Sequence, residues 1–274
     1  MSKKVLLVGF GKLGQSIANN IIKNKHQLTV LKRTYVSPQN DISFINHDIR
    51  TSIPNTLLHA QFDEVIICVT PNGRNKVAYQ DVFLDGVLPF CKSINTKHIW
   101  FISSSAVYEQ NDGSVVNEQS HCAPTSFNGQ VLLQCENEIL KHCKKHNIKA
   151  TMLRLAGIYG ADRRHLINLI EDGFYPEQLH YTNRIHQEDA ANIIATLIDK
   201  QVKESVINVC DNYSATLQEV ADYIREIIHV PNKKQWLKPL QQNKQISNQL
   251  LKTYFNDFKY PTYKQGFIDS LEHS

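Results

Sequence analysis

The sequence predicts an α/β protein built on a Rossmann-type, doubly wound parallel sheet of about seven strands. Short apolar runs recur along the chain and end in glycine or polar turns, as buried parallel strands do. Segments with the periodicity of amphipathic helices separate these runs, which is typical of a sheet covered by helices. The first run leads directly into a glycine-rich turn, Gly9-Phe10-Gly11-Lys12-Leu13-Gly14.

The apolar runs and the periodic segments place the individual elements. The expected strands are 5–8, 27–31, 42–46, 63–70, 98–102, 150–155 and 205–210. The expected helices are one that follows Gly14 and those at 79–92, 131–142, 188–200 and 217–228. Thr216 and Glu219 form a capping-box signature at the start of the last of these. We expect one domain, 1–274, in which about 160–185 and 212–274 form a small substrate-side subdomain.

The glycine-rich turn has the spacing GxGxxG between a strand and a helix, the context of a dinucleotide-binding turn. In this geometry Gly9 permits the tight turn, Gly11 lets the backbone approach a pyrophosphate, and Gly14 lets the helix pack closely. The helix start presents unpaired N–H groups to the phosphates. The alternative is a glycine turn in an α/β protein that binds no nucleotide.

The end of the second strand favours NADP over NAD. Proteins that bind NAD usually carry an acidic residue about 20 residues beyond the glycines, where it accepts hydrogen bonds from the ribose 2′-hydroxyl. No acidic residue occurs between Gly9 and Asn40, and Lys32 and Arg33 stand at the strand end instead. An arginine there can bind a 2′-phosphate. The alternative is a pair of solvated cations.

Composition excludes several other classes of protein. Hydrophobic content of 42%, charged content of 20% and a net charge of +4, with no long basic run, do not indicate nucleic-acid binding. No apolar stretch is long enough for a membrane span or typical of a signal peptide, and we expect a cytoplasmic protein whose six cysteines are free thiols. His142 and His146, with Cys143, fit a basic helix end better than a metal site, so no metal is expected.

Several later motifs together resemble the extended short-chain dehydrogenase/reductases of the NAD(P)-dependent epimerase/dehydratase kind, over the whole length of the chain. They are the serine-rich strand end with Val-Tyr at 103–108, Glu118 and Pro124, the segments 153–160 and 184–189, and Asn208 with Asp211. The GxGxxG spacing and the segments 246–248 and 260–266 are most similar to an atypical bacterial branch, often called YeeZ-like.

The resemblance implies roles for individual residues. Ser104 occupies the position of the catalytic hydroxyl, and Ser105 is its neighbour. The residues implied to bind the dinucleotide are Gly9, Gly11, Lys12, Leu13 and Gly14 at the pyrophosphate, Arg33 at the adenosine ribose or its 2′-phosphate, Asp48 and Ile49 beside the adenine, and Thr70 and Pro71 beside the nicotinamide ribose.

The tyrosine–lysine pair on which the family's chemistry depends is missing. In the family a tyrosine precedes a lysine by four residues, and the lysine lowers the tyrosine pKa for proton exchange during hydride transfer. Counted back from Glu136, which resembles a family glutamate, the pair falls at Asn128 and Leu132; a shift of one gives Phe127 and Val131. Neither register supplies a phenol or a cation.

Two further observations concern the substrate. Sugar-nucleotide dehydratases of the family carry acids after the catalytic hydroxyl, whereas Ser105 and Ala106 follow Ser104, so we expect no dehydratase chemistry. Cations in the loops after later strands are able to clamp an anionic ligand, although each alone is more typical of a loop-bracing residue. They are Arg154, Arg163, Arg164, Arg184 and His186, with His165.

These observations leave three functions open. The first is an NADP(H)-dependent oxidoreductase or epimerase for a small anionic or sugar-like substrate, with Ser104, Tyr108 or a water as proton donor. The second is a non-catalytic dinucleotide-binding redox sensor or regulator. The third, a dehydrogenase from an unrelated Rossmann family, is disfavoured by the motifs after position 100. At the level of the family, a homodimer through 79–92 and 131–142 is expected.

Overall fold

The computed structural model describes residues 2–35, 41–161, 163–175, 180–230, 235–236 and 243–272. The chain divides into two compact units. The first comprises Met1–Tyr108, Cys122–Arg154 and Ala191–Ile207, and the second comprises Glu109–His121, Leu155–Ala190 and Asn208–Ser274. The second unit therefore includes a segment, 109–121, that lies outside the subdomain expected from the sequence.

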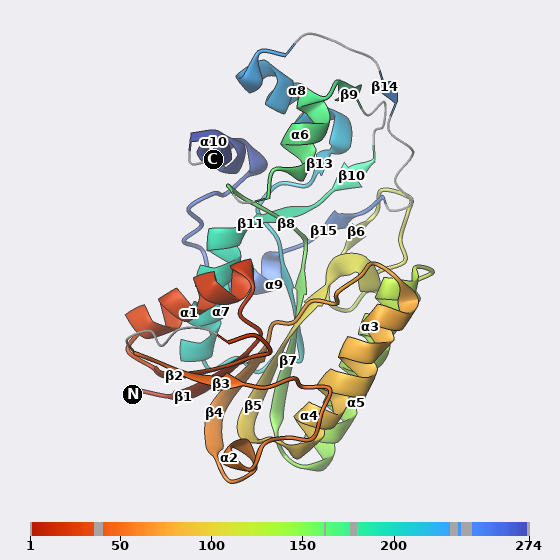
Figure 1. Ribbon diagram of the computed structural model, residues 1–274. Coiled ribbons are helices and arrows are strands. Elements are labelled where there is room, and N and C mark those ends of the chain that lie inside the picture. Colours follow the sequence, from red (N-terminus) through yellow and green to blue (C-terminus); the bar gives the residue numbers. More distant parts are fainter. Residues whose placement is uncertain are drawn as a thin grey trace. The chain divides into compact units, whose positions relative to one another are not determined.

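A seven-stranded sheet has the strand order β12-β7-β5-β4-β1-β2-β3 (Figure 1). Its strands are β1 Lys4–Val8, β2 Gln27–Lys32, β3 Ile42–Asn46, β4 Gln61–Ile67, β5 Asn95–Ser104, β7 Lys149–Leu155 and β12 Val206–Val209. The pairs β1–β2, β2–β3, β1–β4 and β4–β5 are parallel, and the order reverses between β1 and β4. The predicted fold class and all seven predicted strands are confirmed, with small shifts at their ends.

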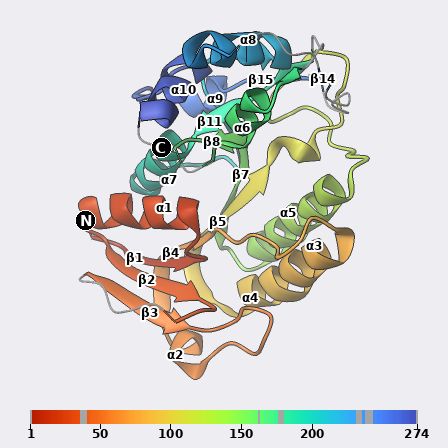
Figure 2. The ribbon, with the colours of Figure 1, turned by 45° about the horizontal axis from the view of Figure 1, so that its top comes forward.

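Helices cover the sheet on both faces. Helices α3, α4 and α5 lie on one face and α1 lies on the other (Figures 1 and 2). The helices of this part of the chain are α1 Lys12–Lys23, α2 Asn55–Leu58, α3 Lys76–Val82, α4 Leu88–Ser93 and α5 Phe127–Lys145, followed by α7 Gln187–Asp199. Ile17, Ala18 and Ile21 of α1 are buried and Ile22 is half-buried, so one apolar side of the helix faces the protein interior. None of the described helices has both the length and the apolar character needed to cross a bilayer.

The helix predicted at 79–92 contains a π-helical turn. This turn, η1 Phe83–Val87, joins α3 to α4. Gly86 lies within it, and a Cβ atom there would come within 3.1 Å of Cγ of Arg50. The glycine therefore lets the Arg50 side chain lie against the helix.

A buried polar network lies towards the amino-terminal ends of the sheet strands. The carboxylate of Glu64 accepts hydrogen bonds from Nζ of Lys3 at 2.6 Å and from Nε1 of Trp100 at 2.7 Å. The His98 ring stacks on Trp100, and its Nε2 lies 3.1 Å from Oγ1 of Thr151. Burial lowers the pKa of His98 to about 3, so this imidazole is neutral at physiological pH.

The second unit packs helices α6 and α8 around an apolar cluster that includes Tyr159, Ile167, Val220 and Phe267. Its elements are β6 Val115–Val116, β8 Gly157–Tyr159, α6 His165–Glu171, β9 Phe174–Tyr175, β10 Tyr181–Thr182, β11 Arg184–His186, β13 Ala215–Thr216, α8 Leu217–Ile228, β14 Gln235–Trp236, β15 Gln245–Ile246, α9 Gln249–Lys252 and α10 Tyr263–Glu272. The predicted capping box of Thr216 and Glu219 is confirmed. All six cysteines are free.

Candidate functional site

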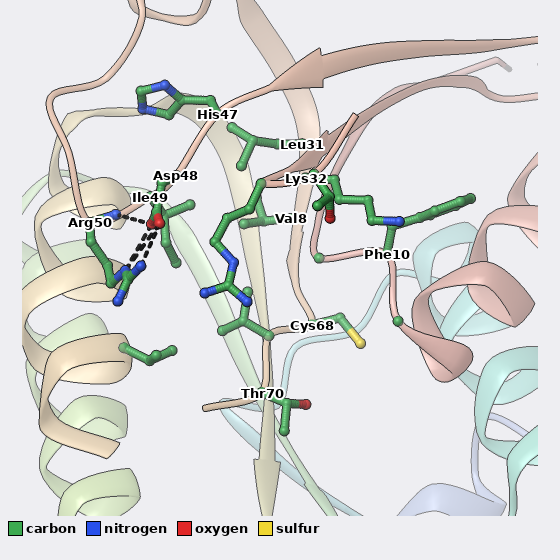
Figure 3. Close-up of a pocket in the computed structure, with 16 residues that line it drawn as sticks. Val8, Phe10, Leu31, Lys32, His47, Asp48, Ile49, Arg50, Cys68 and Thr70 are labelled. Atoms are coloured by element: carbon green, nitrogen blue, oxygen red, sulfur yellow. Dashed lines mark hydrogen bonds and ion pairs between the residues drawn. The ribbon is translucent and has the colours of Figure 1, made fainter. Parts of the chain in front are cut away.

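A cavity of about 360 Å³ lies at the carboxyl-terminal ends of β1, β2, β3 and β4 (Figure 3). The sheet order reverses between β1 and β4, and open α/β sheets bind ligands at this point. Six residues expected to contact a dinucleotide line the cavity: Gly9, Gly11, Arg33, Asp48, Ile49 and Thr70. The other four are not among its lining residues: Lys12, Leu13, Gly14 and Pro71.

The backbone of the glycine turn has the geometry that the GxGxxG spacing predicts. Gly9 has a φ of 102°, and a Cβ atom there would lie 2.1 Å from the carbonyl oxygen of Cys68. A Cβ atom on Gly14 would lie 2.5 Å from the carbonyl oxygen of Gly9, so α1 approaches the turn too closely for any side chain. A Cβ atom on Gly11 would meet no atom within 4 Å. Gly11 thus leaves open space beside the cavity.

The amino terminus of α1 opens at this turn. Its N-cap residue is Gly11, which provides no side-chain hydrogen bond, and no acidic residue lies in its first turn. The first N–H groups of a helix need partners and carry the positive end of the helix dipole. The turn and the helix end together fit an anionic group such as a pyrophosphate.

Two cations at the end of β2 line the cavity. Nζ of Lys32 lies 5.6 Å from the centre of the Phe10 ring, and Nη2 of the exposed Arg33 donates to Oδ1 of Asn72 at 2.9 Å. Neither cation is within an ion-pair distance of a carboxylate among the described residues. Their charges are therefore not neutralised by a carboxylate in the part of the chain that the structure describes.

Asp48 is held by Arg50, a residue that no sequence motif had assigned to the site. Arg50 donates from Nη2 to Oδ2 of Asp48 at 2.6 Å and from Nε to Oδ1 at 3.0 Å (Figure 3). Its Nη1 donates to Oδ2 of Asp81 at 2.6 Å. The hydrogen bonds from the Arg50 side chain lower the pKa of Asp48 to about 2. Asp48 is the only acidic residue among the described residues that line the cavity. An arginine two positions after the aspartate was the available signal.

Of the expected catalytic serines, Ser104 is the last residue of β5 and Ser105 begins the short helical turn Ser105–Val107, here called the serine turn. Ser104 is half-buried and its Oγ accepts a hydrogen bond from the backbone N–H of Ala106 at 3.2 Å; Ser105 is also half-buried. Tyr108 is only 1% exposed and lies beneath the Arg154 guanidinium, which is 4.9 Å from its ring centre. This burial makes Tyr108 a poorer candidate for proton donor than Ser104.

The first turn of α5 contacts the serine turn directly. A Cβ atom on Gly129 would lie 2.3 Å from the carbonyl oxygen of Ala106 and 2.6 Å from Cβ of Pro124. Asn128 is half-buried and Leu132 is 5% exposed. The first turn of α5 is therefore packed against the serine turn, and Asn128 and Leu132 supply neither a phenol nor a cation there.

Arg154 has a structural role, and the expectation that it binds substrate is corrected. Its Nη2 donates to Oε2 of Glu136 at 2.7 Å, and its Nη1 donates to Sγ of Cys122 at 3.3 Å. Arg154 is 5% exposed and Glu136 is 1% exposed. A buried cation needs such a partner, because solvation by water is lost. The sequence could not show that a glutamate on α5 faces an arginine on β7.

The other four predicted substrate cations lie in the second unit. Arg163 is exposed and donates to Oε1 of Gln187 at 2.9 Å, while Arg164 pairs with Glu171 at 3.1 Å. Strands β8 and β11 are parallel and pair His186 with Tyr159 and Arg184 with Gly157. Burial lowers the pKa of His186 to about 4. The structure therefore brings two of the four, Arg184 and His186, together on one strand.

Arg184 belongs to a buried polar cluster. Its Nη1 donates to Oγ1 of Thr182 at 2.5 Å, and burial lowers the pKa of Arg184 to about 10. Burial also raises the pKa of Asp211 to about 7. Among the described residues, Oδ2 of Asp211 and Oη of Tyr159 are buried without a hydrogen-bond partner. Buried polar atoms of this kind usually bond to water or a ligand.

Comparison with known proteins agrees with the architecture. A family model described as the NAD dependent epimerase/dehydratase family matches residues 5–210. A solved structure of a putative NAD-dependent epimerase/dehydratase from Methylobacillus flagellatus has a TM-score of 0.81 and 25% identity, over 99% of this chain and 98% of that one. No curated protein matches the sequence significantly.

Two epimerases have the same fold. UDP-glucuronic acid 4-epimerase from Bacillus cereus, in complex with NAD, has a TM-score of 0.80 at 18% identity, over 98% of this chain and 96% of that one. UDP-N-acetylglucosamine 4-epimerase from Methanobrevibacter ruminantium M1 has a TM-score of 0.83 at 18% identity, over 99% of this chain and 98% of that one.

Proposed function

The chain belongs to the NAD-dependent epimerase/dehydratase family, and on this basis we propose that it binds NADP(H) and acts as an oxidoreductase or epimerase on a small anionic or sugar-like substrate. The observation that carries the proposal is the cavity at the ends of β1 to β4, with its open glycine turn and its two cations. Dehydratase chemistry is not proposed, because Ser105 and Ala106 follow Ser104 where dehydratases of the family carry acids.

The residues around the cavity fit a dinucleotide. The turn Gly9–Gly11 and the amino terminus of α1 would hold the pyrophosphate, because they offer N–H donors in open space. Arg33, with Lys32, would hold a 2′-phosphate. Asp48 would not act as the acidic residue that binds the ribose 2′-hydroxyl of NAD, since its carboxylate is engaged by Arg50. When bound, the nicotinamide supplies or accepts a hydride.

Ser104 is the proposed hydroxyl at the reacting carbon. It would hydrogen-bond to a substrate oxygen and pass a proton to or from it with the help of water, because α5 offers no phenol. Arg163, Arg164, Arg184 and His186 of the second unit are proposed as substrate-side residues. Of these, Arg184 best fits an anionic group, since its guanidinium is buried and donates to the neutral hydroxyl of Thr182.

A fluorescence titration with NADPH and, in parallel, with NADH tests the proposal. We expect micromolar binding of NADPH, weaker binding of NADH, and a reversed order in Arg33→Asp. Arg74→Asp is the matched control, because Arg74 is exposed but does not line the cavity. A preference of the native protein for NADH would refute the role of Arg33, and failure to bind either compound would refute the proposed function.

A second candidate function is a redox sensor or regulator that binds the dinucleotide without turnover. It is favoured by the intact glycine turn together with the absence of tyrosine and of an early lysine on α5, whose sequence is FNGQVLLQCENEILKHCKK. A panel of carbonyl compounds offered to the NADPH-bound protein separates the two functions. Consistent oxidation by one class of compound would exclude the sensor.

A further inference from the structure

We propose that Asn72 and Phe10 are positioning residues for the two cations at the end of β2, and that they determine how strongly a 2′-phosphate is preferred. Asn72 orients Arg33 through its amide oxygen. Phe10 orients Lys32 through the face of its ring. The proposal rests on the proposed function, because it requires a dinucleotide in this cavity. The ratio of NADPH to NADH affinity measures it separately from binding as a whole.

The first argument is the contact between Arg33 and Asn72. Nη2 of Arg33 donates to Oδ1 of Asn72 at 2.9 Å, and the two residues follow β2 and β4, respectively. A guanidinium carries its N–H donors in a rigid plane, so a hydrogen bond at one corner restricts its orientation and leaves its other edges for a ligand. Two of the remaining donors can bind a phosphate in a bidentate manner.

The second argument is the contact between Lys32 and Phe10. Nζ of Lys32 lies 5.6 Å from the centre of the Phe10 ring, within the range of a cation–π interaction (Figure 3). Phe10 is 8% exposed, and Phe44 on β3 holds its ring by an edge-to-face contact with ring centres 5.3 Å apart. The ring attracts the ammonium group but offers it no lone pair. The N–H donors of Lys32 therefore stay available for a phosphate oxygen.

The third argument is that both partners are neutral. Within the described part of the chain, neither Lys32 nor Arg33 is within ion-pair distance of a carboxylate. A third cation that lines the same cavity, Arg50, is held by the carboxylates of Asp48 and Asp81, so its charge is compensated. The charges that remain to attract an anion are therefore those at the end of β2.

The fourth argument is what a ligand gains from cations that are already oriented. Arginine and lysine side chains have many rotamers, and a ligand that binds them must stop this motion. Partners that hold the cations beforehand reduce this loss of entropy and increase affinity. A phosphate monoester benefits most, because it has three acceptor oxygens and a charge of about −1.5 to −2 at pH 7. The ribose hydroxyl of NADH carries no charge, so its affinity should depend little on either contact.

Fluorescence titrations of the full chain with NADPH and NADH test the proposal. Asn72→Asp keeps an acceptor for Arg33 but compensates its charge, and we expect the ratio of NADPH to NADH affinity to fall by about tenfold. Asn72→Ala removes the acceptor without adding a charge and should lower the ratio about two- to fivefold. Phe10→Leu removes the aromatic face beside Lys32 and should lower the ratio by a similar factor, about two- to fivefold.

Double variants show whether the two residues act through the cations. In an Arg33→Gln background, Asn72→Ala should cause no further fall in the ratio, because the group that it positions is gone. In a Lys32→Gln background, the same is expected of Phe10→Leu. A residue that contacts the phosphate itself, or that only supports the fold, would keep its effect in these backgrounds.

Two variants outside the cavity are the matched controls. Asn256→Asp adds the same charge at another exposed asparagine. Phe258→Leu removes another aromatic ring with an edge-to-face partner, Phe255, at 5.2 Å. Both controls should keep the native ratio.

The outcomes are distinguishable. Retention of the native ratio in Asn72→Asp or in Phe10→Leu overturns this proposal and leaves the proposed function intact. An equal effect of Asn72→Ala with and without Arg33 does the same. Asn72 is exposed, so its variants decide the question if Phe10→Leu does not fold. A native protein that binds neither NADPH nor NADH overturns the proposed function, and this proposal with it.

Discussion

Replacement of Glu136 by glutamine tests the structural role of Arg154. The change removes the charge that faces a guanidinium of which only 5% is exposed, and Glu136 itself is 1% exposed. Loss of one partner of a buried ion pair costs about 3–5 kcal/mol, because the other charge stays buried without compensation. Glutamine keeps one acceptor oxygen, so we expect about 3 kcal/mol. For a large domain this corresponds to a decrease in Tm of about 6–12 °C.

Thermal and urea unfolding followed by circular dichroism measures the effect. Glu171→Gln is the control, because it removes an exposed pair with Arg164 and should change the free energy of unfolding by less than about 1 kcal/mol. The double variant Arg154→Met with Glu136→Leu should recover much of the loss, since apolar side chains of similar volume replace both charges. If the free energy of unfolding of Glu136→Gln stays within about 0.5 kcal/mol of the native value, the ion pair with Glu136 does not hold Arg154 in place.

Three further predictions concern the glycine turn, the polar network and the serine. Gly11→Ala should weaken NADPH binding without lowering Tm, because a Cβ atom at Gly11 meets no protein atom within 4 Å. Gly14→Ala should lower both the NADPH affinity and Tm, because its Cβ atom would lie 2.5 Å from the carbonyl oxygen of Gly9. An unchanged NADPH affinity in Gly11→Ala would contradict a pyrophosphate at the turn. His98 is held neutral, with a pKa of about 3 against 6.5 when unfolded, so its contribution to stability is complete above pH 6.5 and is lost as the pH falls toward 3. Urea unfolding measures how the free energy of unfolding changes with pH. Below pH 6.5 this dependence should be weaker in His98→Gln than in the native protein, by up to about 1.4 kcal/mol per pH unit. An equal pH dependence in the two proteins would show that His98 is not buried in its neutral form. Ser104→Ala should lower turnover with nearly unchanged NADPH affinity, and full activity would remove Ser104 from the mechanism.

The fold was predictable from the sequence because its signals are local. The glycine turn illustrates this point: the positive φ of Gly9 and the close approach at Gly14 are steric requirements within six residues. The capping box of Thr216 and Glu219 is equally local. Each such signal joins adjacent elements, so strand and helix positions followed from it.

The structure revealed contacts between segments that are distant in the sequence. Glu136 and Arg154 are 18 residues apart, and Arg50 and Asp81 are 31 residues apart. Such pairs depend on which strand lies beside which helix, and no periodicity records that information. The same holds for Arg154, because a cation at a strand end has the same sequence signature whether or not a glutamate faces it.

The reaction is harder to predict than the cofactor, and α5 shows why. Its first turn lies so close to the serine turn that Gly129 has no room for a Cβ atom, and Ser126 caps the helix by accepting a hydrogen bond from the N–H of Gly129. By the family resemblance, the tyrosine and lysine are expected on this helix at Asn128 and Leu132, or at Phe127 and Val131 if the register shifts by one. Leu132 is 5% exposed and packs as a core residue. A lysine introduced there would bury a charge without a partner, so restoring activity requires more than the two family residues. The Asn128→Tyr and Leu132→Lys double variant should therefore be less stable than the native protein.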